Sequence, residues 1–200
     1  MSRSLRLVPV SSDPDGYVSS GLAPAARRSA LIWAYVLTVG RLPIGGVVVW
    51  AVFAENLAVV IAATAVFILV DLYDGHYARE NAVETGRRRA TDGVLDKLCV
   101  HAALLSVATA VPEILGVWSV MVARDALQFY FGVRFCRWTG MVAAGATWHR
   151  PYSLAMAGWG IAVFYTGTPL LVGGCVSAAY GFLVLFDYVR QLRTIDPQTS

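Results

Sequence analysis

The strongest structural signal in this 200-residue chain is the stretch LAVVIAATAVFILVDLYDGHYAR, residues 57–79. Its first part, residues 57–70, contains only apolar residues and one threonine. A helix that crosses a bilayer needs about 20 mainly apolar residues, and this stretch is long enough to supply one. The stretch then continues into two aspartates, Asp71 and Asp74. It therefore predicts a membrane-spanning helix that carries carboxylates at one end.

The composition of the whole chain predicts the same class of protein. Hydrophobic residues make up 57% of the chain and charged residues only 14%. A soluble domain is closer to a quarter charged, so this chain has too few charges to cover a surface that faces water. The same figures exclude a disordered chain, and three cysteines at unrelated spacings give neither a disulfide framework nor a metal-ligand pattern. We therefore expect an integral membrane protein.

Six segments are apolar enough to be membrane spans, although the fifth is short. We expect an all-α membrane domain over residues 30–190, with helices at residues 30–53, 57–79, 92–111, 114–135, 151–167 and 170–190. Residues 1–29 contain no apolar targeting segment. They are expected to form a cytoplasmic segment, for which a position at the membrane interface stays open. Residues 191–200 are expected to form a cytoplasmic tail.

The arginines sort by loop along the chain. They gather in the N-terminal segment, in the loops after the second and fourth spans, and in the C-terminal tail. The loops near Glu55, Glu113 and Gly167 contain no lysine or arginine. Because positively charged loops stay on the cytoplasmic side of a membrane, both termini are expected in the cytoplasm. The expected location is the plasma membrane, as a multi-pass protein.

Four aspartates lie at the expected cytoplasmic ends of the second and third spans: Asp71, Asp74, Asp92 and Asp96. Their spacings, i, i+3 and i, i+4, place each pair on one helical face. If the two helices are adjacent and antiparallel, the pairs converge and repel, so they need a cation. Clustered carboxylate oxygens suit Mg²⁺ or Mn²⁺, and we expect one or two such ions. The alternative is that the aspartates mark the water boundary or pair with nearby arginines.

The residues around the aspartates form a longer pattern. Asp71-x-x-Asp74-Gly-x-x-Ala-Arg79, followed by Asp92-x-x-x-Asp96, resembles the signature of the CDP-alcohol phosphotransferase family. Arg88 stands where that signature has its second glycine, two residues after Gly86. Three further segments are similar to the phosphatidylglycerophosphate synthase and cardiolipin synthase branch: Leu37-Thr-Val-Gly-Arg-Leu-Pro43, Asp96-Lys97 and Arg124-Asp125.

The resemblance implies a membrane enzyme of phospholipid biosynthesis. Its active site would lie at the cytoplasmic ends of the second and third helices, where a phosphatidyl group passes from CDP-diacylglycerol to an alcohol and CMP is released. The acceptor implied is glycerol 3-phosphate or phosphatidylglycerol. The family also implies a homodimer, and the expected partners are the lipid donor, the acceptor and the bilayer, with no nucleic acid.

The resemblance also assigns roles to individual residues. The catalytic base would be Asp96, and the Mg²⁺ or Mn²⁺ ligands would be Asp71, Asp74, Asp92 and Asp96. The residues implied to bind the CDP group are Asp71, Gly75, Ala78 and Arg79. The resemblance favours Arg41 or Arg124 as a ligand of the acceptor phosphate. Arg134 and Arg150, beside the cytoplasmic loop after the fourth span, are further acceptor candidates, with simple anchoring of that loop as the alternative.

Three alternatives stay open at this point. Arg41 and Arg124 lie within apolar spans, where each could form a structural ion pair, for instance with Asp125 or Asp187. A divalent-cation transporter could also use clustered aspartates, although a transport path has no need of the Gly-x-x-Ala-Arg segment. A non-catalytic member of the family is the third alternative, because Arg88 replaces a signature glycine.

Overall fold

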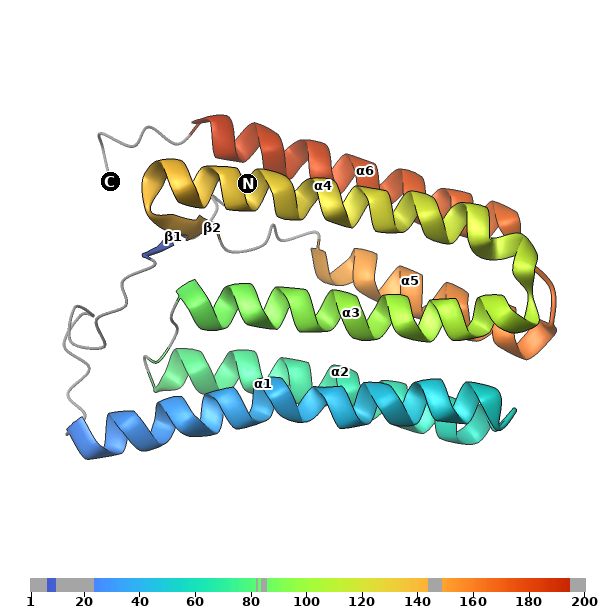
Figure 1. The fold of residues 1–200 in the computed structure, drawn as a ribbon, viewed down its shortest axis with the longest axis horizontal. Helices are drawn as coiled ribbons and strands as arrows, with labels where there is room; N and C mark the ends of the chain where they lie inside the picture. The colour runs from blue at the N-terminus through green and yellow to red at the C-terminus, as the bar shows by residue number, and fades with distance from the viewer. Residues whose placement is uncertain (1–6, 10–23, 82, 84–85, 144–148, 195–200) are drawn as a thin grey trace.

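The computed structural model describes residues 7–9, 24–81, 83, 86–143 and 149–194, and the fold that it shows is mainly helical (Figure 1). The long helices are α1 (Pro24–Phe53), α2 (Leu57–Glu80), α3 (Gly86–Ala110), α4 (Leu115–Thr139), α5 (His149–Thr166) and α6 (Leu171–Thr194). A short 3₁₀ helix, Pro112–Ile114, precedes α4. The six expected helices are thus all present, and each lies close to its expected range.

A short β-ribbon is the one departure from the expected all-α fold within the described residues. The strands β1 (Leu7–Pro9) and β2 (Met141–Ala143) pair antiparallel, with Leu7 opposite Ala143. This pairing ties a part of the N-terminal segment to the connection between α4 and α5. The rest of that segment up to residue 23, and the tail from residue 195, lie outside the described residues.

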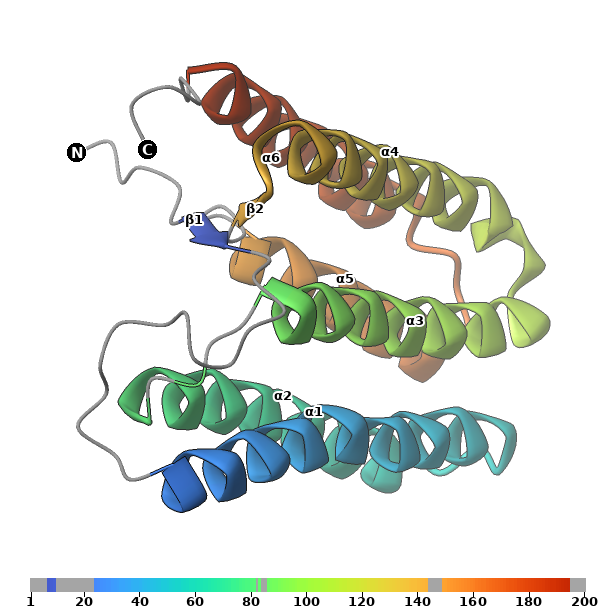
Figure 2. The same ribbon diagram turned by 60° about the vertical axis from the view of Figure 1, so that its left-hand side comes forward.

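The helices form three layers of two (Figure 2). One outer layer consists of α1 and α2, the middle layer of α3 and α5, and the other outer layer of α4 and α6. The middle layer contacts both outer layers: α3 packs on α1 and α4, and α5 packs on α2 and α6. Because successive helices are antiparallel, the ends of α2, α4 and α6 and the beginnings of α1, α3 and α5 lie at the same end of the bundle. We call this end the aspartate end, because Asp71, Asp74, Asp92 and Asp96 lie near it.

Four of the helices are long and apolar enough to cross a membrane, judged by length and composition. The segments concerned are Arg28–Phe53, Leu57–Ala78, Arg88–Ala110 and Leu171–Arg193. The helix α4 differs from them because it carries buried Arg124 and Asp125 near its middle. The helix α5 differs because it is only 18 residues long. The structure thus supports a multi-pass membrane protein with at least these four candidate spans.

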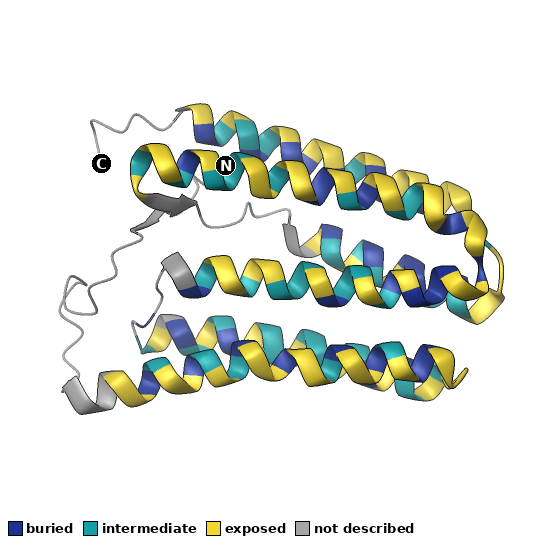
Figure 3. Ribbon diagram, in the orientation of Figure 1, coloured by how far each residue is buried: buried dark blue, intermediate teal, exposed yellow. Residues whose placement is uncertain are grey.

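The outer faces of the helices are apolar as well as exposed (Figure 3). Large exposed side chains include Trp50, Leu69, Val172 and Phe186. Such an extensive apolar surface is unfavourable in water but is the expected surface toward lipid. The composition of the chain and the surface of the fold therefore both indicate an integral membrane protein.

Glycines allow α6 to approach α5 closely. A Cβ atom at Gly181 would lie 2.5 Å from Cε2 of Tyr152, and one at Gly174 would lie 2.6 Å from Cζ2 of Trp159. Small residues at helix interfaces are typical of membrane proteins, where close backbone approach replaces a hydrophobic driving force. The contact with Gly181 holds Tyr152 in a fully buried position, next to charged residues of α3 and α4.

Candidate active site

Three aspartates at the aspartate end share one space. Asp71 comes from the last turns of α2, and Asp92 and Asp96 come from the first turns of α3. One carboxylate oxygen of each lies within 4.8 Å of the other two. Their side chains are 30–31% exposed, so the cluster is open to ligands from outside the protein. The predicted convergence of the two helices therefore occurs for these three residues.

Arg41 lies at the centre of this group, although it comes from a different helix. Its guanidinium group, which is fully buried, forms ion pairs with all four motif aspartates. Nη1 lies 2.7 Å from Oδ1 of Asp71 and also contacts Asp96, while Nη2 contacts Asp92 and lies 3.3 Å from Asp74. Arg41 thus acts as the shared counter-ion of the carboxylates.

Asp74 has different surroundings from the other three aspartates. Its side chain is only 1% exposed. Oδ1 accepts a hydrogen bond from Nη2 of Arg88, and Oδ2 accepts hydrogen bonds from Oγ1 of Thr38 at 2.9 Å and from Nη2 of Arg41 at 3.3 Å. Donors from α1 and α3 therefore surround this carboxylate, and Asp74 joins three helices. It does not belong to the group whose oxygens converge.

The converging group fits a divalent cation. Asp71, Asp92 and Asp96 supply hard oxygen ligands of the kind that Mg²⁺ and Mn²⁺ prefer. Each carboxylate has two oxygens, and Arg41 contacts Oδ1 of each of these three residues. An ion can therefore be held on carboxylates that are also in contact with Arg41.

The residues implied for CDP binding lie on the same helical turns as Asp71 and Asp74. Gly75 is half-buried, and Ala78 is buried against Ala30, Ala34 and Val83. The small side chain of Ala78 thus lets α2 pack closely on α1. The backbone of residue 79 belongs to α2, but the side chain of Arg79 lies outside the described residues.

A second charged network lies behind the carboxylates, between α3 and α4. Asp125 accepts from Nζ of Lys97 at 3.2 Å, contacts Nε2 of His101 at 2.9 Å, and pairs with Nη1 of Arg124 at 2.5 Å. Arg124 also contacts Gln128 and donates from Nε to the carbonyl oxygen of Gly181 on α6 at 2.8 Å. Since Lys97 directly follows Asp96, this network and the carboxylate group are joined through adjacent residues of α3.

Tyr152 on α5 completes the second network. Nζ of Lys97 lies 4.9 Å from the centre of its ring, and Cζ of Arg124 lies 4.5 Å from it. Cations above an aromatic ring are attracted by its negative face, more strongly when they are removed from water. The ring therefore stabilises two cations that share one carboxylate, buried Arg124 and partly buried Lys97.

The four arginines expected to bind the acceptor have different surroundings. Arg41 and Arg124 form the structural ion pairs that were the alternative, Arg124 with Asp125 but Arg41 with the motif aspartates rather than with Asp125 or Asp187. Arg134 is exposed on α4, 3.4 Å from the hydroxyl group of Tyr130. The side chain of Arg150 lies outside the described residues.

Sequence reasoning gave no partners to Thr38, Lys97 and His101, which belong to the two networks. Their spacing contains a signal, because Thr38 lies three residues before Arg41 and His101 lies four residues after Lys97. Residues at these separations share a helical face. The signal indicates which polar residues act together but not which helix they face.

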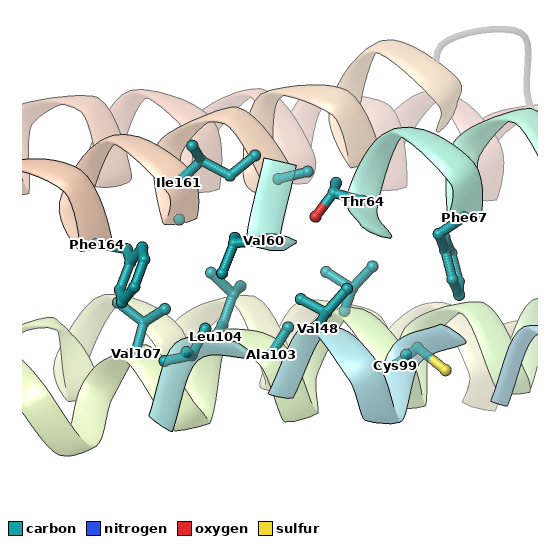
Figure 4. A pocket seen from close by; sticks show the side chains of 15 residues that line it. Val48, Val60, Thr64, Phe67, Cys99, Ala103, Leu104, Val107, Ile161 and Phe164 are labelled. Atoms are coloured by element: carbon teal, nitrogen blue, oxygen red, sulfur yellow. The ribbon is translucent and has the colours of Figure 1, made fainter. Parts of the chain in front are cut away.

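An apolar cavity lies between α1, α2, α3 and α5 (Figure 4). It lies below the carboxylates in the sense that it is farther from the aspartate end along the helix axes. Its upper lining includes Gly45, Phe67 and Cys99, each three or four residues from Arg41, Asp71 or Asp96 along its helix. At 1.5 Å per residue, the cavity begins about 5–6 Å below the charged groups. Its lower lining includes Val52, Val60 and Val107, seven or eight residues farther along the helices, so it extends roughly 10–12 Å farther.

The comparisons with known proteins agree with the signature. The sequence pattern that describes the CDP-alcohol phosphatidyltransferase family matches residues 31–186, which is most of the chain. Searches of the curated proteins and of the solved structures returned no match. The matched range covers all of the helical turns that carry the carboxylates and both charged networks.

Proposed function

The chain belongs to the CDP-alcohol phosphatidyltransferase family, and on this premise we propose that it transfers a phosphatidyl group from CDP-diacylglycerol to an alcohol. The observation that carries the proposal is the convergence of Asp71, Asp92 and Asp96 beside buried Arg41, directly above an apolar cavity. A diphosphate and a lipid chain can meet only where charged and apolar surfaces adjoin in this way. A cation transporter has no use for the family pattern along the chain.

The carboxylate group supports a dependence on Mg²⁺ or Mn²⁺. The residues that would hold the ion are Asp71, Asp92 and Asp96. A bound divalent cation would neutralise charge on the diphosphate and so stabilise the leaving CMP. Arg41 contributes a fixed positive charge to the same region.

Asp96 is the residue we assign as general base. Its side chain is half-buried in the cluster, and one of its oxygens is in contact with Arg41. The acceptor hydroxyl oxygen forms a bond to the phosphorus that carries the diacylglycerol, and its proton passes to the Asp96 carboxylate. The bond from that phosphorus to the bridging oxygen breaks, and the electron pair leaves with CMP. Positioned bases of this kind contribute about 10²–10⁴-fold to a rate.

The apolar cavity supports a donor that carries long chains. With the cytidine diphosphate at the carboxylates, one acyl chain can extend downward among the residues that line the cavity. The lining contains Val48, Leu104 and Phe164, and Thr64 is its polar exception in Figure 4. Because the chain would enter from lipid and not from water, its packing against these side chains would hold it there, with little contribution from the hydrophobic effect.

Arg134 and Arg150 are the arginines that we keep as acceptor ligands. Arg134 is exposed on α4, whereas Arg41 and Arg124 are held in ion pairs within the bundle. Guanidinium groups bind phosphate oxygens by charge-assisted hydrogen bonds. The acceptor class proposed is therefore a phosphate-bearing alcohol, with glycerol 3-phosphate and phosphatidylglycerol as the two candidates.

We further propose that all six helices cross the plasma membrane, with both termini in the cytoplasm, and that the enzyme forms a homodimer. The structure supports the six spans because α4 and α5 both lie alongside the other helices of the bundle: α4 packs on α6 and α3, and α5 packs on α6, α3 and α2. The charged groups near the middle of α4, Arg124 and Asp125, are buried inside the bundle. Light scattering of the purified protein would give the oligomeric state.

The test is release of CMP by the purified protein. CDP-diacylglycerol should be offered with glycerol 3-phosphate, phosphatidylglycerol, inositol phosphate and serine in separate reactions. We expect release with a phosphate-bearing acceptor and none in the presence of a chelator. Uptake of Mg²⁺ into liposomes without CMP release would support a transporter instead, and neither activity would indicate a non-catalytic member.

A further inference from the structure

We propose that this enzyme holds a single divalent cation, on Asp71, Asp92 and Asp96, and that Arg88 keeps Asp74 out of the metal site. The inference rests on the proposed function, because it concerns the ion that the transfer reaction needs. It goes beyond the signature, in which all four aspartates are expected as ligands. It also gives a role to the residue at which this chain departs from that signature.

The contacts of Asp74 carry the first step of the argument. A carboxylate that binds a metal must turn an oxygen toward the ion. Both oxygens of Asp74 are already occupied, Oδ1 by Arg88 and Oδ2 by Thr38 and Arg41. Arg88 also approaches the backbone carbonyl oxygen of Asp74 at 3.5 Å, so it is bound to the α2 backbone as well as to the side chain.

Burial carries the second step. The side chains of Arg88 and Asp74 are 5% and 1% exposed. Removing one member of a buried ion pair leaves an uncompensated charge in a low-dielectric region, which is strongly unfavourable. Asp74 therefore cannot turn toward an ion without breaking its own buried pair with Arg88. The other three aspartates are about 30% exposed, and Arg41 contacts only Oδ1 of each, so each can offer its second oxygen to an ion without breaking that pair.

The charge of the cluster carries the third step. Arg41 and Arg88 offset two of the four negative charges. With only the described side chains counted, two negative charges remain, which one divalent ion would offset. A glycine at position 88, as the signature has it, would leave Oδ1 of Asp74 without this donor and the cluster with a further negative charge. The arginine thus takes the place of positive charge that a second ion would otherwise supply.

The experiment counts bound ions directly. Mn²⁺ is added to the purified protein, and electron paramagnetic resonance measures the ion that stays free. We expect one Mn²⁺ per chain for the wild type and two for Arg88→Gly, because the substitution frees Asp74. The matched control is Arg190→Gly, at an exposed position of α6, which should bind one.

A second variant tests the inference even if Arg88→Gly does not fold. In the double variant Asp74→Asn/Arg88→Gln both buried charges are removed together, so neither is left unpaired. We expect it to bind one Mn²⁺ with an affinity within about threefold of wild type, whereas loss of a true ligand or of its support costs about 10-fold or more. Asp92→Asn should show that larger loss.

Three results would overturn the inference: two ions on the wild type, a 10-fold loss of affinity in the double variant, or a single ion on folded Arg88→Gly. CMP release by the same preparations separates this inference from the proposed function. One ion without CMP release would refute the proposed function alone. Two ions with CMP release would refute the inference alone.

Discussion

Nη1 of Arg41 on α1 lies 2.7 Å from Oδ1 of Asp71 on α2, although the two residues are 30 positions apart in the sequence. The same guanidinium group contacts the other three motif aspartates. Four carboxylates this close would repel one another strongly without a cation among them. Arg41 is therefore the group that makes the cluster compatible with a folded protein.

The first prediction concerns this counter-ion. Arg41→Gln should lower the unfolding temperature in the presence of a chelator, since breaking a buried ion pair costs about 3–5 kcal/mol. Mg²⁺ should restore part of the loss, because it supplies the missing positive charge. Arg190→Gln, at an exposed position, should change the free energy of unfolding by no more than about 0.5 kcal/mol. Equal unfolding temperatures for Arg41→Gln and wild type in chelator would contradict the assignment.

The second prediction separates the base from a simple ligand. Asp96→Asn should lower kcat by roughly 10²–10⁴-fold, because the amide cannot accept the proton. Saturating Mg²⁺ should not restore kcat, and binding of CDP-diacylglycerol should persist. Asp187→Asn on α6 is the matched control and should keep normal turnover. Recovery of Asp96→Asn at high Mg²⁺ would show that Asp96 is only a metal ligand.

The helices were predictable from the sequence because an apolar run of bilayer length has few stable structures in lipid other than a membrane-spanning helix. The helix ends opposite the aspartate end agree closely with expectation, as for Phe53 and Leu57. The polar ends were predicted less well: α3 begins at Gly86 rather than at residue 92, and α4 continues to Thr139 rather than 135. Hydropathy marks where a helix leaves the apolar region, whereas the backbone hydrogen bonds continue beyond it.

The candidate site was predictable only where its members are close in sequence. Spacing placed Asp71 near Asp74 and Asp92 near Asp96, and the short connection brought the two pairs together. No local pattern predicts that Arg41 lies among them, because that depends on the rotation of α1 against α2 and α3. The same holds for Arg88, whose contact with Asp74 crosses from one helix to the next.

The third prediction concerns the network behind the cluster. Asp125→Asn should lower the free energy of unfolding by about 3–5 kcal/mol, because buried Arg124 and partly buried Lys97 would then lack their carboxylate partner. Adding Lys97→Met should recover part of that loss by removing one of the two cations. Thermal unfolding in detergent measures both, with Glu113→Gln at an exposed position as the control. No recovery in the double variant would mean that the charges are not coupled.

The fourth prediction decides between four and six membrane spans. If only α1, α2, α3 and α6 crossed the membrane, the connection between α4 and α5 would lie on the same side as Glu113. With six spans it lies on the opposite side. In a variant without Cys99, Cys136 and Cys175, Glu113→Cys should react with an impermeant thiol reagent added to intact cells, and Arg137→Cys should not. Labelling at both positions would exclude six spans.

The fifth prediction tests whether the apolar cavity receives an acyl chain of the donor. Ala103 lines the cavity from α3, whereas its neighbour Ala102 is exposed on the outside of the same helix. In Ala103→Phe the ring should fill space that the chain needs, and overpacking of this kind costs about 1–3 kcal/mol, so KM for a long-chain donor should rise about tenfold. The value of kcat should change little, because the carboxylates lie more than one helical turn above.

Chain length and the neighbouring alanine supply the controls for this prediction. A donor with six-carbon chains leaves the lower cavity empty, so its KM should be nearly the same in Ala103→Phe and wild type. Ala102→Phe adds the same ring toward lipid and should leave KM unchanged for both donors. If Ala102→Phe and Ala103→Phe raised KM equally, or if the short-chain donor were affected as strongly as the long one, the chain would lie elsewhere. The cavity would then be a packing defect between α1, α2, α3 and α5 rather than a part of the donor site.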